Sequence, residues 1–332
     1  MIKFAVVGYG WWGQHIVRRL QAHEELDVRA VVEPRTSQHQ TITDLGLTAL
    51  TEIESVLSDP EIDAVVLTTP NEIHEKQVHQ AAAAGKHVYC EKPLGLTADS
   101  ARRSVDACEK ARVQLGMGHE RRFEPALQSV RQMVLNGDLG TIMHAEAAFS
   151  HDKLIHVPPG DWRTSPTLSP AAGMTAMGVH LTDYYISIFG RVKTVQAITA
   201  RRLLEWETGD VVTAQLGFEA GMTATLSALL YTPHFIRTHV FGSHKWAEAR
   251  SDTHPDTPGG VTELVVMQTG QEPSVTRFDW TDTVTENLLA FAQAVRGEAD
   301  YPIKYDEMIH NIEVLEAIAE SAQSGKTVHL KV

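Results

Sequence analysis

Residues 2–13, with the sequence IKFAVVGYGWWG, decide the fold of this chain. The apolar run Lys3–Val7 predicts a buried strand, and a segment of helical period over Gly13–His23 follows the glycine-rich turn. In this G-x-G-x-x-G pattern, Gly8 permits a tight turn, Gly10 lets a ligand approach the backbone, and Gly13 lets the helix pack closely on the strand. Because free N–H groups at a helix N-terminus attract anions, the turn predicts a binding site for the pyrophosphate of a dinucleotide.

A carboxylate at the end of the next predicted strand supports this interpretation. The strand covers Val28–Glu33, and Glu33 lies about 20 residues beyond the glycines, where a carboxylate accepts hydrogen bonds from the adenosine ribose. The same charge repels a 2′-phosphate, so NAD is favoured over NADP as the cofactor. Arg35 leaves NADP open, because its guanidinium can pair with a 2′-phosphate or stack on adenine.

The remainder of the first 120 residues alternates short apolar runs with segments of helical period. Such alternation predicts a parallel sheet with single-helix crossovers, which is typical of a doubly wound α/β domain. We assign residues 1–121 to this NAD-binding Rossmann domain. The further strands are expected at Asp63–Thr68, His87–Cys90 and Val113–Gly116, and the helices over Ile73–Ala84 and from Thr97 or Asp99 to Ala111.

Residues 122–332 follow another pattern, and we expect a C-terminal α+β domain for substrate binding and oligomerisation. Alternating strands with a hairpin across Ala220–Gly221 predict a large, mostly antiparallel sheet. The strands are expected at Ile142–Ser150, Val192–Arg201, Val211–Glu219, Met222–Leu230 and His239–Phe241. Helices over Pro125–Asn136, Met177–Phe189, Thr285–Val295 and Tyr305–Gln323 can cover one of its faces.

The composition narrows the class of partner. Lys and Arg total 29 against 42 Asp and Glu, a formal net charge of −13, and an acidic surface repels nucleic acid and anionic lipid. No apolar run approaches the roughly 18 residues of a membrane span, and no leader peptide is visible. Only Cys90 and Cys108 are present, which favours a reducing cytoplasm. We therefore expect a small-molecule substrate, with no nucleic acid and no membrane as partner.

Two further motifs carry a resemblance to a known family. Glu91-Lys92-Pro93 follows the strand His87–Cys90, at the carboxyl edge where doubly wound sheets bind ligands. The sequence GMTAMGVHLTD, residues Gly173–Asp183, lies far downstream at the start of a helix. Together with the glycine-rich turn, Thr69-Pro70-Asn71 and Arg121-Arg122-Phe123, these motifs resemble the Gfo/Idh/MocA oxidoreductases over the whole chain. That family includes glucose–fructose oxidoreductase and inositol dehydrogenases.

The resemblance implies an NAD(P)-dependent dehydrogenase that acts on a CH–OH group of a sugar, sugar acid, cyclitol or related cyclic polyol. Lys92 would hold the reacting oxygen or act as a base, and His180 would accept or relay the proton. A homodimer or homotetramer is also implied, for which the second face of the C-terminal sheet offers a surface. The implied cofactor-binding residues are Gly8, Tyr9, Gly10, Trp11, Trp12, Gly13, Glu33, Arg35, Thr69, Pro70, Asn71, His74, Glu91 and Lys92.

One position departs from the family pattern. Family dehydrogenases typically carry Asp where this chain has Ala176, one helical turn before His180. Three explanations are open: the substrate carries its own charge or needs no such partner, another carboxylate such as Glu120 substitutes, or ordinary dehydrogenase activity has been lost. Asp183 is retained, and it can orient the imidazole of His180 or contact a substrate hydroxyl.

Other candidates rest on weaker signals. Arg163, in a proline-rich loop, resembles a family position near cofactor and substrate, although a loop packed on the surface explains it equally well. Arg122 is a further candidate for substrate binding. Trp11 and Trp12 could cover the cofactor or pack between domains, and packing is favoured. His151, Asp152 and His156 could line the same cleft as Arg163, although we favour solvated side chains for them.

The histidines do not predict a metal site. His74 and His79 are five residues apart, which places them on different faces of a helix. Two alternatives keep the cofactor but change the activity. A redox-assisted glycosidase would oxidise its sugar transiently without net NADH release, and a non-catalytic NAD-binding regulator would explain Ala176.

Overall fold

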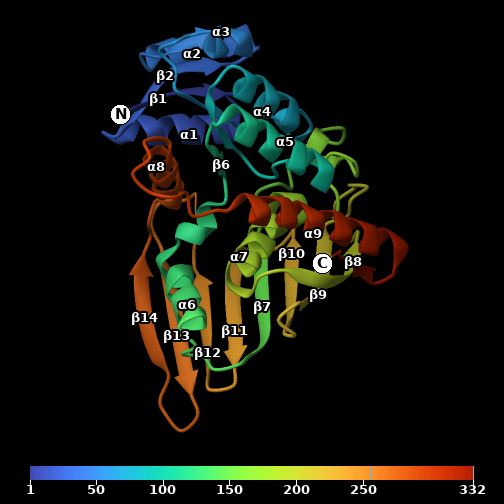
Figure 1. Ribbon diagram of the computed structural model, residues 1–332. Helices are drawn as coiled ribbons and strands as arrows, with labels where there is room; N and C mark the ends of the chain where they lie inside the picture. The colour runs from blue at the N-terminus through green and yellow to red at the C-terminus, as the bar shows by residue number, and fades with distance from the viewer. Residues whose placement is uncertain (255, 332) are drawn as a thin grey trace. The chain divides into compact units, whose positions relative to one another are not determined.

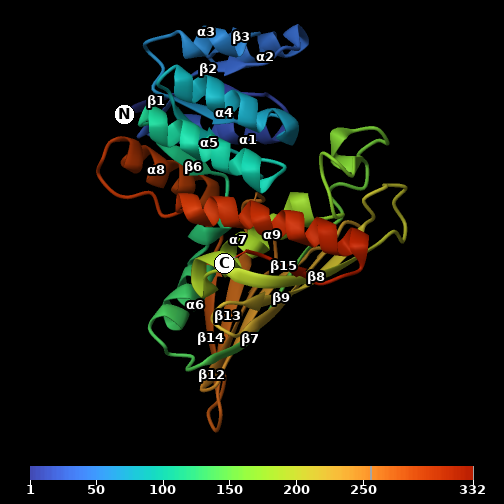
Figure 2. The ribbon, with the colours of Figure 1, turned by 45° about the vertical axis from the view of Figure 1, so that its right-hand side comes forward.

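The computed structural model describes residues 1–254 and 256–331, which form two compact units. The first unit comprises Met1–Glu120 and Val284–Ile309, and the second comprises Arg121–Thr283 and His310–Val332 as far as it is described. Figure 1 colours the chain from its N-terminus to its C-terminus, and Figure 2 shows it turned. Each unit has its own sheet.

The first unit is built on a parallel sheet of six strands in the order β3-β2-β1-β4-β5-β6. This order reverses beside β1, which is the arrangement that binds dinucleotides at the carboxyl ends of the strands. The α/β prediction is therefore confirmed. The strands are β1 (Ile2–Val7), β2 (Leu26–Val32), β3 (Thr48–Leu50), β4 (Ala64–Leu67), β5 (His87–Cys90) and β6 (Leu115–Met117).

Three helices of this unit, α1, α4 and α5, lie where the sequence predicts crossovers. Thr97 caps α5 (Ala98–Ala111): its hydroxyl accepts from the backbone N–H of Ser100, and the hydroxyl of Ser100 accepts from the backbone N–H of Thr97. Figure 2 shows α4 and α5 side by side against the sheet. The helices are α1 (Trp11–Ala22), α2 (His39–Asp44), α3 (Ile53–Leu57), α4 (His74–Ala83), α5 (Ala98–Ala111) and α8 (Thr283–Val295), which begins at the last residue of the second unit.

The segment after α8 also belongs to this unit. Asn287 donates hydrogen bonds to the carbonyl of Met117 and to the hydroxyl of Tyr89, and the hydroxyl of Tyr301 bonds the backbone of Met117. The Phe291 ring packs so closely on Gly116 that a Cβ there would meet it at 2.5 Å. These contacts anchor residues 284–309 on β5 and β6.

The second unit is built on a nine-stranded sheet in the order β14-β13-β12-β11-β7-β10-β9-β8-β15. Its pairs are antiparallel except for β7 with β10, which is parallel, so the expected mostly antiparallel sheet is confirmed. The strands are β7 (Ile142–Ser150), β8 (Val192–Ala200), β9 (Val211–Phe218), β10 (Thr223–Leu229), β11 (Phe235–Gly242), β12 (Lys245–Ser251), β13 (Val261–Gln268), β14 (Ser274–Asp279) and β15 (Val328–His329).

Helices cover one face of this sheet (Figure 1). They are α6 (Pro125–Leu135), α7 (Val179–Phe189) and the part of α9 (Tyr305–Ser324) that belongs to the second unit. Alternate residues of β9 and β10 face the core, and the others are partly or fully exposed. The prediction of a homo-oligomer through the second face therefore stays a prediction.

The short elements were not expected from the sequence. The strand β3 has three residues and α3 five, too few for a recognisable period. The strands β12, β13 and β14 lie toward one edge of the second sheet, where partial exposure on both faces weakens the apolar alternation. Across residues 1–254 and 256–331, no helix is long and apolar enough to cross a membrane.

Candidate active site

The glycine-rich turn after β1 has the geometry that its sequence predicts. Gly8 has φ +98°, a conformation that side chains disfavour. A Cβ on Gly13 would lie 2.1 Å from the carbonyl oxygen of Gly8, so only glycine fits between the turn and α1. A Cβ on Gly10, in contrast, would meet nothing within 4 Å. The backbone of Gly10 therefore leaves room for a ligand.

The N-terminus of α1 is available to an anion. Gly10 is the N-cap residue, no side chain caps the helix, and the first turn carries no acidic residue. Trp11 is 59% exposed and contacts the rings of Trp12 and His15, and the choice between covering the cofactor and packing between domains stays a prediction. Uncapped N–H groups and open space at Gly10 together fit the pyrophosphate of a dinucleotide.

Glu33, at the end of β2, is held against this turn. Its carboxylate accepts from the backbone N–H of Tyr9 at 3.0 Å, and the guanidinium of Arg35 donates to it at 2.7 and 3.0 Å. The hydrogen bond from Arg35 is the main cause of a lowered pKa, so Glu33 is ionised near neutrality. Glu33 and Arg35 thus form an ion pair beside the glycine-rich turn.

The turn after β4 is fixed from within. His74 is fully buried, and its ring nitrogens lie 2.9 Å from the carbonyl oxygen of Thr69 and 2.8 Å from that of Pro93. Pro70 precedes a short helical turn, Asn71–Ile73, in which Asn71 is buried. His74 therefore joins the Thr69 turn to the turn after Lys92, which is a positioning role.

Glu91 and Lys92 follow β5 at the same edge of the sheet as the glycine-rich turn. Glu91 is buried, and a Cβ on Gly118 would lie 2.4 Å from its carboxylate oxygen. Its Oε2 accepts from the backbone N–H of Lys92, whereas no hydrogen bond of normal geometry reaches Oε1 from the described residues. Burial raises the pKa of Glu91 to about 7, against the opposing influence of Trp12 and Lys92.

This buried carboxyl group predicts a pH-dependent stability. The folded-state pKa of Glu91 lies above its ordinary value of 4.5, so ionisation opposes folding, with no penalty at low pH and the full penalty above about 7. The unfolding free energy of Glu91→Gln minus that of the natural chain should rise by roughly 2 kcal/mol when the pH is raised from 5 to 8. Urea unfolding at both pH values measures this gain. Glu72→Gln, at an exposed carboxylate, is the control, and an equal gain for both variants would contradict the prediction.

Glu120, the carboxylate considered as a substitute at the site, ends the first unit. It is buried, and it opens a short helical turn, Glu120–Phe123.

Cys90 and Cys108 are buried as free thiols, and burial raises the pKa of both. Within the part of the chain that the structure describes, no group of three or more His, Cys, Asp or Glu residues could hold a metal ion.

His180 lies in the second unit, at the start of α7. A π-helical segment, Met174–Gly178, leads into this helix, and such segments are frequent at functional sites. Ala176 lies in the segment and packs against the apolar core of the unit, so no carboxylate occupies that position. The His180 side chain is buried, with its ring 6.0 Å from the ring of Phe149.

Arg122 and Asp183 contact each other. Nε and Nη2 of Arg122 donate to the two carboxylate oxygens of Asp183 at 2.7 and 2.6 Å, with Asp183 buried and Arg122 partly buried. A two-pronged pair of this kind is geometrically strong and fixes the turn Glu120–Phe123 to α7. We propose that these residues position the elements around His180.

Arg163 belongs to a half-exposed turn. Its guanidinium lies 4.2 Å from the ring centre of Trp162 and pairs with Asp161, whose carboxylate also caps the turn by accepting from the backbone N–H of Arg163. These contacts of Arg163 are thus with Asp161 and Trp162 of the same turn, as expected for a loop packed on the surface.

Sequence reasoning missed a cluster around Phe149 in the second unit. Four side chains surround this ring: Arg121 at 5.2 Å, His254 at 5.4 Å, His151 at 5.8 Å and His180 at 6.0 Å, which we call the Phe149 cluster. His151 is 5% exposed, so the expectation of a solvated side chain is wrong. Residues more than 100 positions apart meet here, and no local sequence pattern indicates it.

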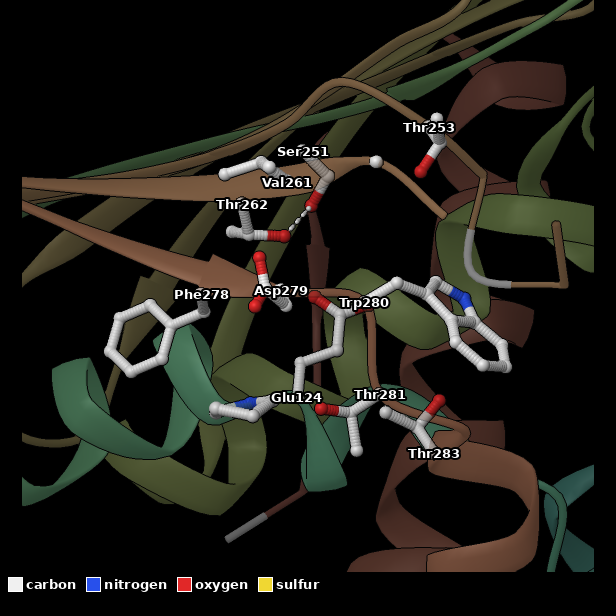
Figure 3. Close-up of a pocket in the computed structure, with 12 residues that line it drawn as sticks. Glu124, Ser251, Thr253, Val261, Thr262, Phe278, Asp279, Trp280, Thr281 and Thr283 are labelled. Atoms are coloured by element: carbon white, nitrogen blue, oxygen red, sulfur yellow. Dashed lines mark hydrogen bonds between the residues drawn. The ribbon is translucent and has the colours of Figure 1, made fainter. Parts of the chain in front are cut away.

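A pocket of the second unit adjoins Arg121 through Glu124 (Figure 3). In this view the carboxyl groups of Glu124 and Asp279 lie between the rings of Phe278 and Trp280. Burial raises the pKa of Glu124 although Arg121 donates to it at 3.1 Å. The pocket is also lined by the hydroxyls of Ser251, Thr253, Thr262, Thr281 and Thr283.

Comparison with known proteins agrees with this geometry. A D-xylose 1-dehydrogenase (NADP(+)) of Haloferax volcanii is 28% identical over 99% of this chain and 100% of its own. A putative NADPH-dependent oxidoreductase of Desulfitobacterium hafniense superimposes with a TM-score of 0.90 at 22% identity, over 99% of this chain and 97% of its own. A levoglucosan dehydrogenase in complex with NADH superimposes with a TM-score of 0.87 at 16% sequence identity, over 99% of each chain.

Two family models match successive parts of the sequence. Residues 2–119 match the model described as an oxidoreductase family with an NAD-binding Rossmann fold, and residues 127–248 match the C-terminal domain of the same family. The two matches span most of the chain, in the order that the resemblance predicted. The chain belongs to the Gfo/Idh/MocA family of oxidoreductases.

Proposed function

We propose that this protein is an NAD-dependent dehydrogenase, which transfers a hydride between a hydroxyl carbon of a sugar, sugar acid, cyclitol or related polyol and the nicotinamide. The observation that carries the proposal is the carboxyl edge of the first sheet. There an open Gly10 and an uncapped helix N-terminus follow β1, the Glu33 carboxylate follows β2 and Lys92 follows β5. The names of the relatives, a xylose and an inositol dehydrogenase among them, support the substrate class.

Lys92 and His180 would carry the proton chemistry. Oxidation of a secondary alcohol removes the hydroxyl proton while the carbon loses a hydride, for which a bound nicotinamide supplies the acceptor. The Lys92 amine would hydrogen-bond the reacting oxygen and stabilise its developing negative charge. His180 would take the hydroxyl proton and pass it to solvent. In the reverse direction the same groups return the proton to the carbonyl oxygen.

The position of Ala176 requires another partner or none. Its methyl group cannot accept a hydrogen bond from a substrate hydroxyl, which a carboxylate would do. We propose Glu120 as the substitute in the first unit, because it is a buried carboxyl group in the family turn before Arg121-Arg122-Phe123. A substrate that carries its own charge is the alternative.

Glu33 supports NAD as the preferred cofactor, and this gives a prediction. Glu33→Gln keeps the shape and an acceptor for the N–H of Tyr9 but releases Arg35 from its ion pair. The ratio of the NADP and NAD dissociation constants should then shift toward NADP by about tenfold, the size of one charge-assisted contact. Quenching of Trp11 and Trp12 fluorescence measures both constants. Arg35→Ala should not shift the ratio toward NADP, and tighter NADP binding by the natural chain would contradict the preference.

A substrate screen tests the proposal directly. The full-length protein with NAD is mixed with aldoses, sugar acids, cyclitols and short polyols, and reduced nicotinamide is followed by absorbance. We expect stoichiometric NADH formation with at least one class. Turnover without net NADH would instead indicate redox-assisted bond cleavage, and dinucleotide binding without turnover of any class would indicate a regulator.

A further inference from the structure

The Phe149 cluster contains a carboxylate–imidazole pair that the proposed mechanism does not use. The carboxylate Oδ1 of Asp256 lies 2.5 Å from Nδ1 of His254, and Nζ of Lys153 lies 2.6 Å from the same oxygen. The backbone N–H of Asp256 is also within 3.3 Å of this nitrogen, but the contact with the carboxylate is much shorter. Nδ1 of His254 therefore carries the proton and donates it, which leaves Nε2 as a hydrogen-bond acceptor.

The neighbouring imidazole has the opposite tautomer. Nδ1 of His151 accepts from the backbone N–H of Lys153 at 3.2 Å, so its proton is on Nε2. The rings of His151 and His254 are 5.2 Å apart, edge to face. The hydrogen bonds and the ion pair of these two rings within the described residues involve Nδ1 and not Nε2. The pair thus offers one N–H donor and one nitrogen acceptor side by side.

A second carboxylate–imidazole pair of the same unit shows how a purely structural pair differs. His310 donates from Nδ1 to Glu313 at 2.7 Å, and its Nε2 accepts from the backbone N–H of Val192 at 2.8 Å. Both ring nitrogens of His310 are used inside the fold. His254 shares the first contact and lacks the second, so its remaining nitrogen is left for a ligand.

Other polar atoms in the Phe149 cluster or next to it also lack a hydrogen-bond partner among the described residues. Nη1 of Arg121, Oδ2 of Asp256 and Nε2 of His234 are buried and form no hydrogen bond within the described residues. Leaving such atoms unsatisfied costs free energy, about 1–3 kcal/mol each. The His234 ring lies 6.4 Å from that of His254, so these atoms and the open Nε2 atoms gather around one part of the second unit. A polar ligand would satisfy them.

We propose that His151 and His254 bind a hydroxyl group of an uncharged, polyhydroxylated substrate, with His151 donating to its oxygen and His254 accepting its proton. Both rings border Phe149, as His180 does, so the pair would hold a substrate hydroxyl other than the one assigned to Glu120. Asp256 and Lys153 position His254. This inference rests on the proposed dehydrogenase function and narrows its substrate class from charged sugar acids to neutral sugars and cyclitols.

The electrostatics keep both imidazoles neutral. Burial, reinforced by the charges of His254 and Lys153, lowers the pKa of His151 to about 3. Burial also lowers the pKa of His254, although the hydrogen bond and charge of Asp256 oppose this effect. Arg121, His180 and His234 are further charged or titratable groups around the pair, and Asp252 lies near His234. A neutral pair can donate and accept as described, whereas two imidazolium ions could only donate.

The tautomers can be tested without a ligand. In the full-length protein labelled with ¹⁵N-histidine, long-range proton–nitrogen spectra distinguish the two ring forms, with signals assigned by single His→Gln variants. We expect His254 in the Nδ1–H form and His151 in the Nε2–H form from pH 6 to 8, a window set by the ordinary histidine pKa of about 6.5. The same form for both rings, or protonation of either, would overturn the proposal.

Ligand binding tests the pair itself. The NAD-saturated protein is titrated with D-xylose, myo-inositol, glycerol and D-gluconate, and the ring C–H signals are followed. A neutral probe should shift the signals of His151, His180 and His254, and His254→Ala should raise its dissociation constant about tenfold, the value of one hydrogen bond. His310→Gln is the matched control, which should lower thermal stability and leave the constant unchanged.

The outcomes separate this inference from the proposed function. A probe that shifts only His180, or a dissociation constant unchanged by His254→Ala, overturns the role of the pair while leaving the dehydrogenase proposal intact. Selective binding of D-gluconate overturns the choice of a neutral substrate. The proposed function itself fails only if the substrate screen yields no NADH, a readout that does not involve His254.

Discussion

Lys92→Ala should lower kcat/KM for the best substrate by about 10³-fold, the usual size of a lost electrostatic and acid–base contribution. Lys92 follows β5, at the sheet edge where the glycine-rich turn leaves room for a dinucleotide. Its amine is the group that we assign to the reacting oxygen, so its loss removes stabilisation of the developing charge. Dinucleotide affinity should change far less, because Gly10, the α1 N-terminus and Glu33 remain in place.

Steady-state kinetics and a separate measurement of NAD binding check this result. Lys76→Ala, an exposed lysine of α4, is the matched control and should leave both quantities unchanged. Lys92→Arg tests the geometry, because a guanidinium keeps the charge but is larger and cannot lose its proton. Turnover by Lys92→Ala within threefold of the natural chain would remove Lys92 from the mechanism.

The parts of the fold and site that follow local rules could be predicted. The glycine positions follow from sterics at single residues, as the 2.1 Å approach at Gly13 shows, and strands such as β5 and β7 have the bounds that their apolar patterns indicate. Of the two caps that the sequence offered for α5, Thr97 or Asp99, the structure uses Thr97. In a parallel sheet these local features determine one functional edge, because every strand ends there.

The parts that depend on long-range contact could not be predicted. Phe149 and His254 are 105 positions apart, and nothing in either segment indicates that their rings meet. His151 looked like a solvated loop residue because its neighbours are polar, yet it is buried next to His254. Asp183 lies about one turn from His180 in α7, and its two oxygens accept from Arg122, a contact between distant positions that no local pattern indicates. Its role toward the imidazole or a substrate hydroxyl stays a prediction. Partner choice is a tertiary property.

Arg122→Met should destabilise the protein by about 3–5 kcal/mol, the cost of leaving a buried carboxylate without its partner. Asp183 is 1% exposed, and both of its oxygens face the lost guanidinium. Replacing both residues, as in Arg122→Met with Asp183→Leu, removes the uncompensated charge and should restore most of the loss. Urea unfolding of the natural chain, the two single variants and the double variant gives the coupling free energy.

The activity of the double variant distinguishes the two roles considered for Asp183. If the ion pair only fixes the turn Glu120–Phe123 to α7, the stable double variant keeps kcat within about tenfold, since the elements that hold His180 remain packed. If Asp183 instead orients the imidazole or binds a substrate hydroxyl, the double variant folds but loses turnover about 10²-fold or more. The exposed pair Arg102 and Asp99 is the control: Arg102→Met should cost less than about 1 kcal/mol. An equally large loss of unfolding free energy in Arg102→Met would mean that removing the positive charge causes the effect, whether or not the ion pair is buried.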